Sequence, residues 1–213
     1  ARRGVYLNGS NADLSVINSS IDVKSISGTN IGMFGSDQNF HVKGDNTYIN
    51  LLSEGGINFD SNGAGGTFLV ENGAEINAQT SNNQSFSFLN SGETKFEILN
   101  KAKVLLKDNF LGGTNTVSVG TLRFISHGDY SFIIDDADFA IEKSGGDAPA
   151  VRMFGGRNSI LVKNGGTLSI FNQGSGTPAN PTNERSNQAI YFTAGIGTLT
   201  DNGFSVQDPG SKV

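Results

Sequence analysis

One short pattern recurs along this chain and constrains its fold more than any other feature. In residues 68–78 (FLVENGAEINA), a run of alternating apolar residues is followed by a polar Asn-Gly corner and a second alternating run. A fixed period of roughly 20–50 residues with occasional insertions is the sequence signature of a solenoid. Here the pattern recurs at spacings of 26, 28, 28, 36, 28 and 44 residues, each time from a large apolar anchor: Leu14, Phe40, Phe68, Phe96, Phe132, Ile160 and Phe204.

Each repeat also contains a further apolar run upstream of its anchor. A coil therefore holds a strand, a turn, a second strand, a corner and a third strand. Strands of three to five residues are only about 10–17 Å long, but they can stack on the equivalent strand of the next coil at about 4.8 Å and pair every backbone group. The upstream runs read IGMF, INF, FSF, LRF, VRMF and IYF, and they end at Phe34, Phe59, Phe88, Phe124, Phe154 and Phe192.

The corner after the anchored strand holds a residue that tolerates left-handed backbone angles in every repeat. Asn and Asp also hydrogen-bond within their own turn, and stacked Asn residues can bond from coil to coil. Parallel crossovers are overwhelmingly right-handed. We therefore expect a single all-β domain over residues 1–213, a right-handed parallel β-helix of about seven coils. The corner residues are Asn18, Gly44, Asn72, Asn100, Asp136, Asn164 and Asp208.

A β-sandwich of antiparallel hairpins is the alternative fold, because it also has short strands at regular spacing. The recurrence of Phe at one position of the repeat favours the solenoid over the sandwich. The two longest spacings predict insertions at residues 108–119 and 172–188. In a solenoid such insertions leave the corners and can border a binding face, or they can be tolerated surface loops.

Composition excludes several classes of function. The net charge is −5 and the pI is near 5.0, which argues against generic binding to a nucleic-acid backbone. Cysteine is absent, so disulfides and thiolate metal sites are excluded. No apolar run reaches the roughly 18 residues that a membrane-spanning helix needs.

The outward positions of the upstream strands supply the candidate binding site. We expect Asn58, Ser87, Arg123, Arg152 and Tyr191 to form one row, with Arg123 and Arg152 on adjacent coils about 5 Å apart. Two guanidinium groups so close repel each other unless an anion lies between them, and arginine binds carboxylates through two hydrogen bonds. The sequence therefore predicts a cleft for an acidic polysaccharide such as a polyuronate, with the ligand-binding residues Arg123, Arg152, Arg157, Arg185 and Tyr191.

The alternative for these arginines is that each pairs with a nearby acid and only solubilises the wall of the solenoid. The acids within reach along the chain are Asp129, Asp135, Glu142 and Asp147.

Catalytic signals are weak. The run Asp135, Asp136 and Asp138 has the residue types for glycoside hydrolysis or Ca²⁺ binding, but the corner role of Asp136 explains it better. His41 and His127 lie in different coils without metal-ligand spacing. We therefore predict no catalytic residue, no metal site and no cofactor. A polysaccharide lyase would have to use Arg123 with Asp129 and Asp135.

Several stretches carry a resemblance to a known family: FLVENGAEINA, ILVKNGGTLSI, FSFLNSGETKF and the tail AIYFTAGIGTLTDNGFSVQDPGS. With them the chain resembles the pectate-lyase-like β-solenoid adhesion domains of Gram-positive, lactic acid bacterial cell-surface proteins, including the binding regions of serine-rich repeat adhesins. The resemblance implies a secreted, non-enzymatic adhesin that binds host or plant glycans, acidic or mucin-type. Attachment to the cell wall would use regions outside these residues, because the chain contains no anchor motif and no Ser-rich stalk.

Three functional hypotheses follow. The first is an adhesin that binds acidic glycans on a host epithelial or bacterial surface, without nucleic-acid binding or membrane insertion. Its binding should weaken with salt and strengthen at acidic pH, because the net negative charge falls toward zero near the pI. The second is a lyase or hydrolase that acts on polyuronates, and the third is a structural spacer.

Overall fold

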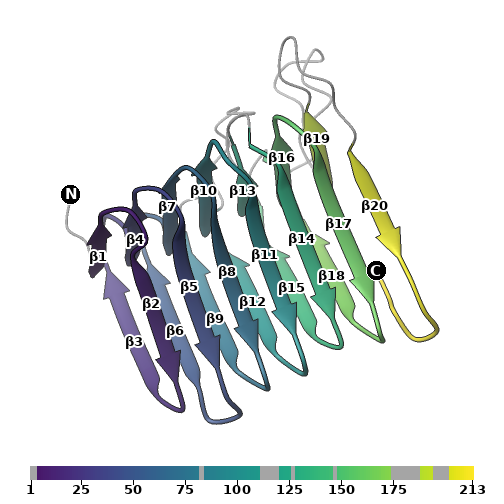
Figure 1. The fold of residues 1–213 in the computed structure, drawn as a ribbon, viewed down its shortest axis with the longest axis horizontal. Coiled ribbons are helices and arrows are strands. Elements are labelled where there is room, and N and C mark those ends of the chain that lie inside the picture. Colours follow the sequence, from purple (N-terminus) through teal and green to yellow (C-terminus); the bar gives the residue numbers. More distant parts are fainter. Residues whose placement is uncertain are drawn as a thin grey trace.

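The computed structural model describes residues 4–81, 84–110, 120–125, 128–145, 148–173, 188–193 and 202–213. In these residues the regular structure is β-strand, arranged in three parallel sheets that run along a solenoid (Figure 1). We name them sheets A, B and C in the order in which each coil visits them. The described part contains no helix long and apolar enough to cross a bilayer.

Each sheet collects every third strand of the chain. Sheet A contains β1 (Val5–Asn8), β4 (Ile31–Phe34), β7 (Phe59–Gly63), β10 (Phe86–Asn90), β13 (Leu122–Phe124), β16 (Val151–Phe154) and β19 (Ile190–Thr193). Sheet B contains β2 (Asp13–Ile17), β5 (Gln38–Lys43), β8 (Gly66–Glu71), β11 (Thr94–Leu99), β14 (Tyr130–Asp135), β17 (Asn158–Lys163) and β20 (Gly203–Val206). Sheet C contains β3 (Ser20–Ser25), β6 (Tyr48–Ser53), β9 (Glu75–Thr80), β12 (Lys103–Asp108), β15 (Asp138–Lys143) and β18 (Thr167–Asn172).

The predicted parallel β-solenoid is confirmed, and the antiparallel sandwich is excluded because the strands pair in parallel throughout the three sheets. The predicted count of about seven coils is slightly too high. In the described part of the chain, sheet C has six strands and the last coil contributes only β19 and β20, so fewer than seven coils are complete.

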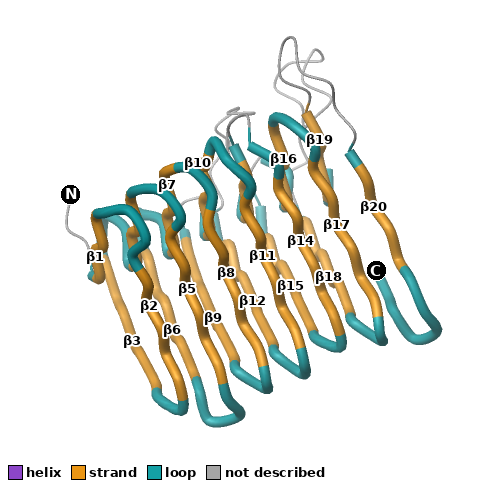
Figure 2. Tube along the Cα trace, in the orientation of Figure 1, coloured by secondary structure: helices purple, strands orange, loops and turns teal. Residues whose placement is uncertain are grey.

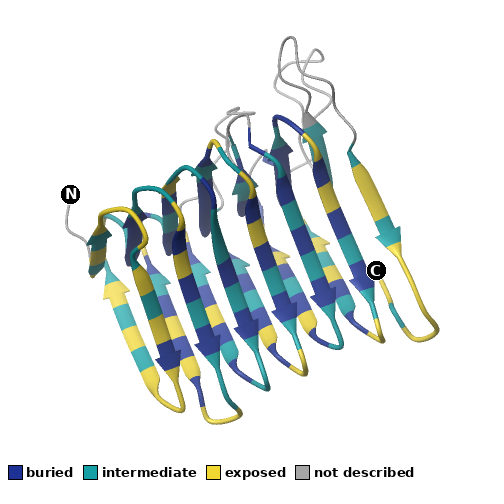
Figure 3. Ribbon diagram, in the orientation of Figure 1, coloured by how far each residue is buried: buried dark blue, intermediate teal, exposed yellow. Residues whose placement is uncertain are grey.

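The apolar anchors form a continuous ladder on the inner side of sheet B. Each anchor is the register partner of the next, from Leu14 to Phe204. The rings of Phe68 and Phe96 lie parallel, with centroids 4.5 Å apart and an interplanar angle of 5°. Phe88 from sheet A packs edge-on against both rings. The core is therefore a stack of aromatic layers, and the buried positions run as stripes across the strands (Figure 3).

The turns from sheet B to sheet C line up along one edge of the solenoid (Figure 2). All seven predicted corner residues, each of which follows a strand of sheet B, have positive φ: Asn18 (48°), Gly44 (107°), Asn72 (57°), Asn100 (54°), Asp136 (50°), Asn164 (53°) and Asp208 (75°). The side chain of Asn100 donates a hydrogen bond to Asn72 Oδ1 at 3.1 Å, which joins two coils. The prediction of a corner ladder is confirmed. Glycine suits position 44 because its φ of 107° lies in a region that residues with a side chain rarely adopt.

Candidate functional site

A row of polar side chains crosses the outer face of sheet A, and it contains three of the predicted site residues. Ser87 is the register partner of Arg123, Arg123 is the partner of Arg152, and Arg152 is the partner of Tyr191. The two arginines therefore occupy adjacent parallel strands, as the repeat spacing predicts. On the other side of Ser87 the row continues with Asp60.

The prediction that Asn58 belongs to this row is wrong. Strand β7 begins at Phe59 instead of ending there, and Phe59 pairs with Phe86. Asn58 is fully buried at the corner before sheet A, where it accepts a hydrogen bond from Asn30 Nδ2 at 2.8 Å and donates one to Ser85 Oγ at 3.0 Å. An inward side chain at this position satisfies buried polar groups and is closed to a ligand.

The two arginines lie in a partly desolvated setting. Arg152 is only 8 % exposed, Arg123 is half-buried, and Arg123 Nε donates a hydrogen bond to Ser87 Oγ at 3.0 Å. Burial lowers the pKa of Arg123, the carboxylate of Asp60 opposes this effect, and the positive charge of Arg152 adds to it. The guanidinium carbon of Arg152 lies 5.9 Å from the centroid of the Phe154 ring, within the range of a cation–π interaction.

Arg157 lies outside the row, in the turn that leads into sheet B. Its Nη2 and Nε lie 2.9 and 3.2 Å from Asp129 Oδ2, and its backbone N–H donates to Asp129 Oδ1 at 2.8 Å. These backbone and side-chain hydrogen bonds lower the pKa of Asp129. Arg157 thus follows the alternative interpretation, in which the arginine pairs with a neighbouring acid. Arg185 lies outside the described residues.

The other acids considered as arginine partners pair with lysines where they are described. Asp135 Oδ2 lies 3.1 Å from Lys163 Nζ, and Glu142 Oε2 lies 3.1 Å from Lys107 Nζ. Asp147 lies outside the described residues, as does much of both predicted insertions.

The structure does not bring together the group that a lyase would use. Asp129 precedes β14 and Asp135 is its last residue, so about six residues at roughly 3.3 Å each separate the two carboxylates along an extended strand. The part of the chain with assigned positions contains no cluster of three or more His, Cys, Asp or Glu side chains that could hold a metal ion.

The two histidines give no catalytic arrangement in the described residues. His127 lies outside them, whereas His41 Nε2 is 3.0 Å from Glu71 Oε1 on the outer face of sheet B. Lys43 Nζ lies 3.3 Å from the same oxygen. Burial raises the pKa of Glu71, but the hydrogen bonds and charges of His41 and Lys43 outweigh this effect, so the pKa lies below its ordinary value. The group is a small surface network of charges.

One charged cluster was missed by the sequence analysis. Lys143 and Asp108 are fully buried, and Lys143 Nζ lies 3.1 Å from Asp108 Oδ2. Thr121 Oγ1 donates to the same oxygen at 2.9 Å, and the backbone N–H of Phe110 donates to Asp108 Oδ1 at 3.0 Å. A signal was present in the sequence, because both charged residues fall at the inward repeat position that Ser53 and Thr80 occupy in earlier coils.

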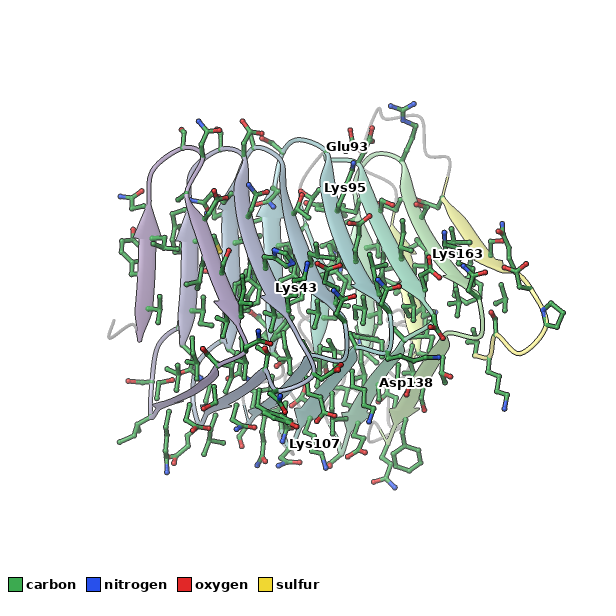
Figure 4. All side chains as sticks on the ribbon, turned by 60° about the horizontal axis from the view of Figure 1, so that its bottom comes forward. Lys43, Glu93, Lys95, Lys107, Asp138 and Lys163 are labelled. Carbon is green, nitrogen blue, oxygen red and sulfur yellow. The ribbon has the colours of Figure 1, made fainter. Side chains whose placement is uncertain are left out.

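A polar groove of about 550 Å³ lies at the corner between sheets A and B. Glu93 and Lys95 project beside each other at its rim (Figure 4). Asn11, Asp37 and Asn39 also line it. Asn11 and Asp37 have φ of 56° and 54°, so this corner carries a second left-handed ladder that the sequence analysis did not identify. None of the predicted site residues lines the groove.

Comparison with protein-family models, with curated proteins and with solved structures found no match.

Proposed function

We propose that this protein is the non-catalytic binding region of a Gram-positive bacterial cell-surface adhesin and that the outer face of sheet A binds acidic or mucin-type glycans. The observation that carries the proposal is the row Arg123–Arg152–Tyr191 on three adjacent strands. The resemblance to pectate-lyase-like adhesion solenoids supports this proposal. We also propose that the solenoid is right-handed. In this proposal the protein is extracellular and attached to the cell wall through regions outside these residues.

The electrostatics of the row favour an anionic ligand. Two guanidinium groups on strands about 4.8 Å apart repel each other, and among the described residues the carboxylate of Asp60 lies in the same row. A ligand carboxylate placed between the arginines relieves this repulsion and can accept two parallel hydrogen bonds from one guanidinium. Because the arginines are partly desolvated, the attraction is screened less by salt than at an exposed site.

The neighbouring side chains suit a sugar. Tyr191 follows Arg152 in the row, and an aromatic ring offers an apolar face together with a polar hydroxyl. A uronic acid has both an apolar ring face and a carboxylate, so it matches the combination of Tyr191 and the arginine pair. The proposed partners are acidic polysaccharides or mucin-type glycans on host or bacterial surfaces.

The test is a binding screen against polygalacturonate, mucin and neutral glycans, followed by titration of two variants. We expect Arg123→Gln to weaken binding to polygalacturonate at least tenfold, which corresponds to about 1.4 kcal/mol. Arg157→Gln is the matched control, because it removes one positive charge at the corner outside the row. Both variants should keep the thermal unfolding midpoint close to that of the unchanged protein.

Two results would contradict the proposal. If no acidic glycan binds at pH 4 or pH 7, the function is wrong. If Arg123→Gln and Arg157→Gln bind equally well, the site is wrong although the function stands. A steady rise in ultraviolet absorbance from polygalacturonate with Ca²⁺ would show unsaturated products and would favour a polysaccharide lyase instead.

A further inference from the structure

We infer that Lys143 and Asp108 are placed to form an intramolecular amide cross-link between strands β12 and β15. The two residues end these adjacent parallel strands and are register partners. Lys143 Nζ lies 3.1 Å from Asp108 Oδ2, and both side chains are fully buried. The inference concerns a covalent modification of the core, and it is independent of the glycan-binding function.

Burial changes the chemistry that is available to this pair. Taking an ammonium group and a carboxylate out of water penalises the charged forms of both groups. Transfer of one proton from nitrogen to oxygen removes both charges and leaves a neutral amine beside a carboxylic acid. The neutral amine is the nucleophile, and the carboxylic acid is the electrophile that an amide bond requires.

Two hydrogen-bond donors polarise the carboxyl group of Asp108. Thr121 Oγ1 donates to Oδ2 at 2.9 Å, and the backbone N–H of Phe110 donates to Oδ1 at 3.0 Å. Donors that are fixed before a reaction stabilise the negative charge that develops on oxygen when a tetrahedral intermediate forms. Phe110 N–H is placed to hold the oxygen that remains as the amide carbonyl, and Thr121 lies beside the oxygen that leaves.

The step balances without any added reagent. Lys143 Nζ forms a bond to Asp108 Cγ, and the bond between Cγ and Oδ2 breaks. A second proton passes from the nitrogen to the leaving hydroxyl, with the hydroxyl of Thr121 as the relay, and one water molecule departs. The product is a secondary amide that keeps one N–H, and no oxidation or reduction takes place.

The chain contains a matched pair at which no cross-link is expected. Lys107 and Glu142 lie one residue earlier on the same two strands and are also register partners. Their Nζ–Oε2 distance is likewise 3.1 Å, but both side chains project to the surface, as Figure 4 shows for Lys107. Water solvates both charges there, so the ion pair stays an ion pair. Comparison of the two pairs isolates the effect of burial.

The experiment is an intact-mass measurement on the purified, folded chain, with peptide mapping after proteolysis. We expect a mass lower than that of the sequence by one water molecule, and a branched peptide that joins residues 108 and 143. Lys143→Arg should restore the full mass, whereas Lys107→Arg should keep the loss of water. Thr121→Val should slow the formation of the cross-link in freshly folded protein.

The full sequence mass after prolonged incubation of the folded protein would overturn the inference. So would a loss of water that peptide mapping places elsewhere, for example in a succinimide at another aspartate. Because the decisive measurement uses the unchanged chain, a variant that fails to fold does not weaken the test.

Discussion

At Gly63 the spacing between neighbouring coils leaves no room for a methyl group. A Cβ added there would lie 1.6 Å from the backbone carbonyl oxygen of Gly35, which belongs to the adjacent coil. The obstacle is backbone, so no rotation of a side chain can relieve it. The hydrogen-bonded stacking of β4 on β7 therefore depends on this glycine.

We predict that Gly63→Ala destabilises the protein by about 1–3 kcal/mol or more, the range for overpacking in a close-packed interior. Gly203→Ala is the control, because no atom lies within 4 Å of its added Cβ. Urea unfolding followed by circular dichroism measures both variants. Equal midpoints for the two would show that the coils can separate at Gly63 at little cost.

The ion pair between Asp129 and Arg157 makes stability depend on pH. The pKa of Asp129 is lower in the folded protein than the ordinary value of 3.8. Such a carboxylate stabilises the fold above the unfolded pKa, and the contribution disappears as the pH falls through the folded pKa. The effect is small because the Arg157 side chain is 71 % exposed.

We predict that Asp129→Asn lowers the free energy of unfolding at pH 7 by less than about 1 kcal/mol. The difference between the variant and the unchanged protein should shrink as the pH drops below 3.8. Urea titrations at several pH values measure this trend. A difference that stays constant down to pH 2 would exclude the ionised carboxylate as its cause.

The positions of some residues in the fold were predictable from the sequence because the backbone conformation alone restricts which residue types can occupy them. The corner positions require left-handed angles, and Asn, Asp and Gly identify them without any knowledge of packing. The partner of Arg157 was not predictable in this way, since several acids lie near it in the sequence and the turn geometry selects Asp129. To predict that Lys143 is buried, one needs the register of sheet C. The apolar pattern does not show to which side of the sheet a polar residue points.

At the scale of the element, the apolar ladder of sheet B packs each coil against the next. Phe96 stacks on Phe68 and packs edge-on against Phe132, and all three rings are buried. Removal of the Phe96 ring leaves a cavity that is lined by rings from all three sheets. Relaxation can fill little of such a space because both neighbouring coils hold their positions.

We predict that Phe96→Ala destabilises the protein by about 3–5 kcal/mol. Phe204→Ala should cost much less, because Phe204 lies on the last strand of the same ladder and is 43 % exposed. Chemical denaturation gives both values. Similar losses at the two positions would mean that the ladder does not control stability.

The register of sheet B was predictable from the sequence, whereas that of sheet A was not, although the strands of sheet B extend two residues upstream of anchors such as Phe68. In sheet B a large apolar residue occupies the anchor position of every coil, so the register is unambiguous. In sheet A the inward position opposite Phe88 holds Ser61, which bonds to Asn90 Oδ1 at 3.2 Å. This serine interrupts the apolar alternation of β7. For this reason Asn58 was assigned from the sequence to the outward row, in the position that Asp60 occupies in the structure.

At the scale of the whole molecule, net charge opposes the binding of a polyanion. The chain carries a charge of −5 at pH 7 and has a pI near 5.0. We predict that affinity for polygalacturonate rises as the pH is lowered from 7 to 5, because repulsion between protein and ligand declines. Added salt should reduce the pH effect by screening. Titrations at both pH values and two ionic strengths test this, and pH-independent affinity would contradict it.

The two ends of the described chain lie at opposite ends of the solenoid (Figure 1). The hydrogen bonds between coils run along the line that joins those ends, so tension applied there loads the coil interfaces one after another. A coil with anchors 28 residues apart lengthens the chain by roughly 90–100 Å when it is released, and the two coils that carry insertions lengthen it by more. The stacked coils would therefore yield in discrete steps whose lengths follow the repeat spacings, and mechanical work would be dissipated at each step.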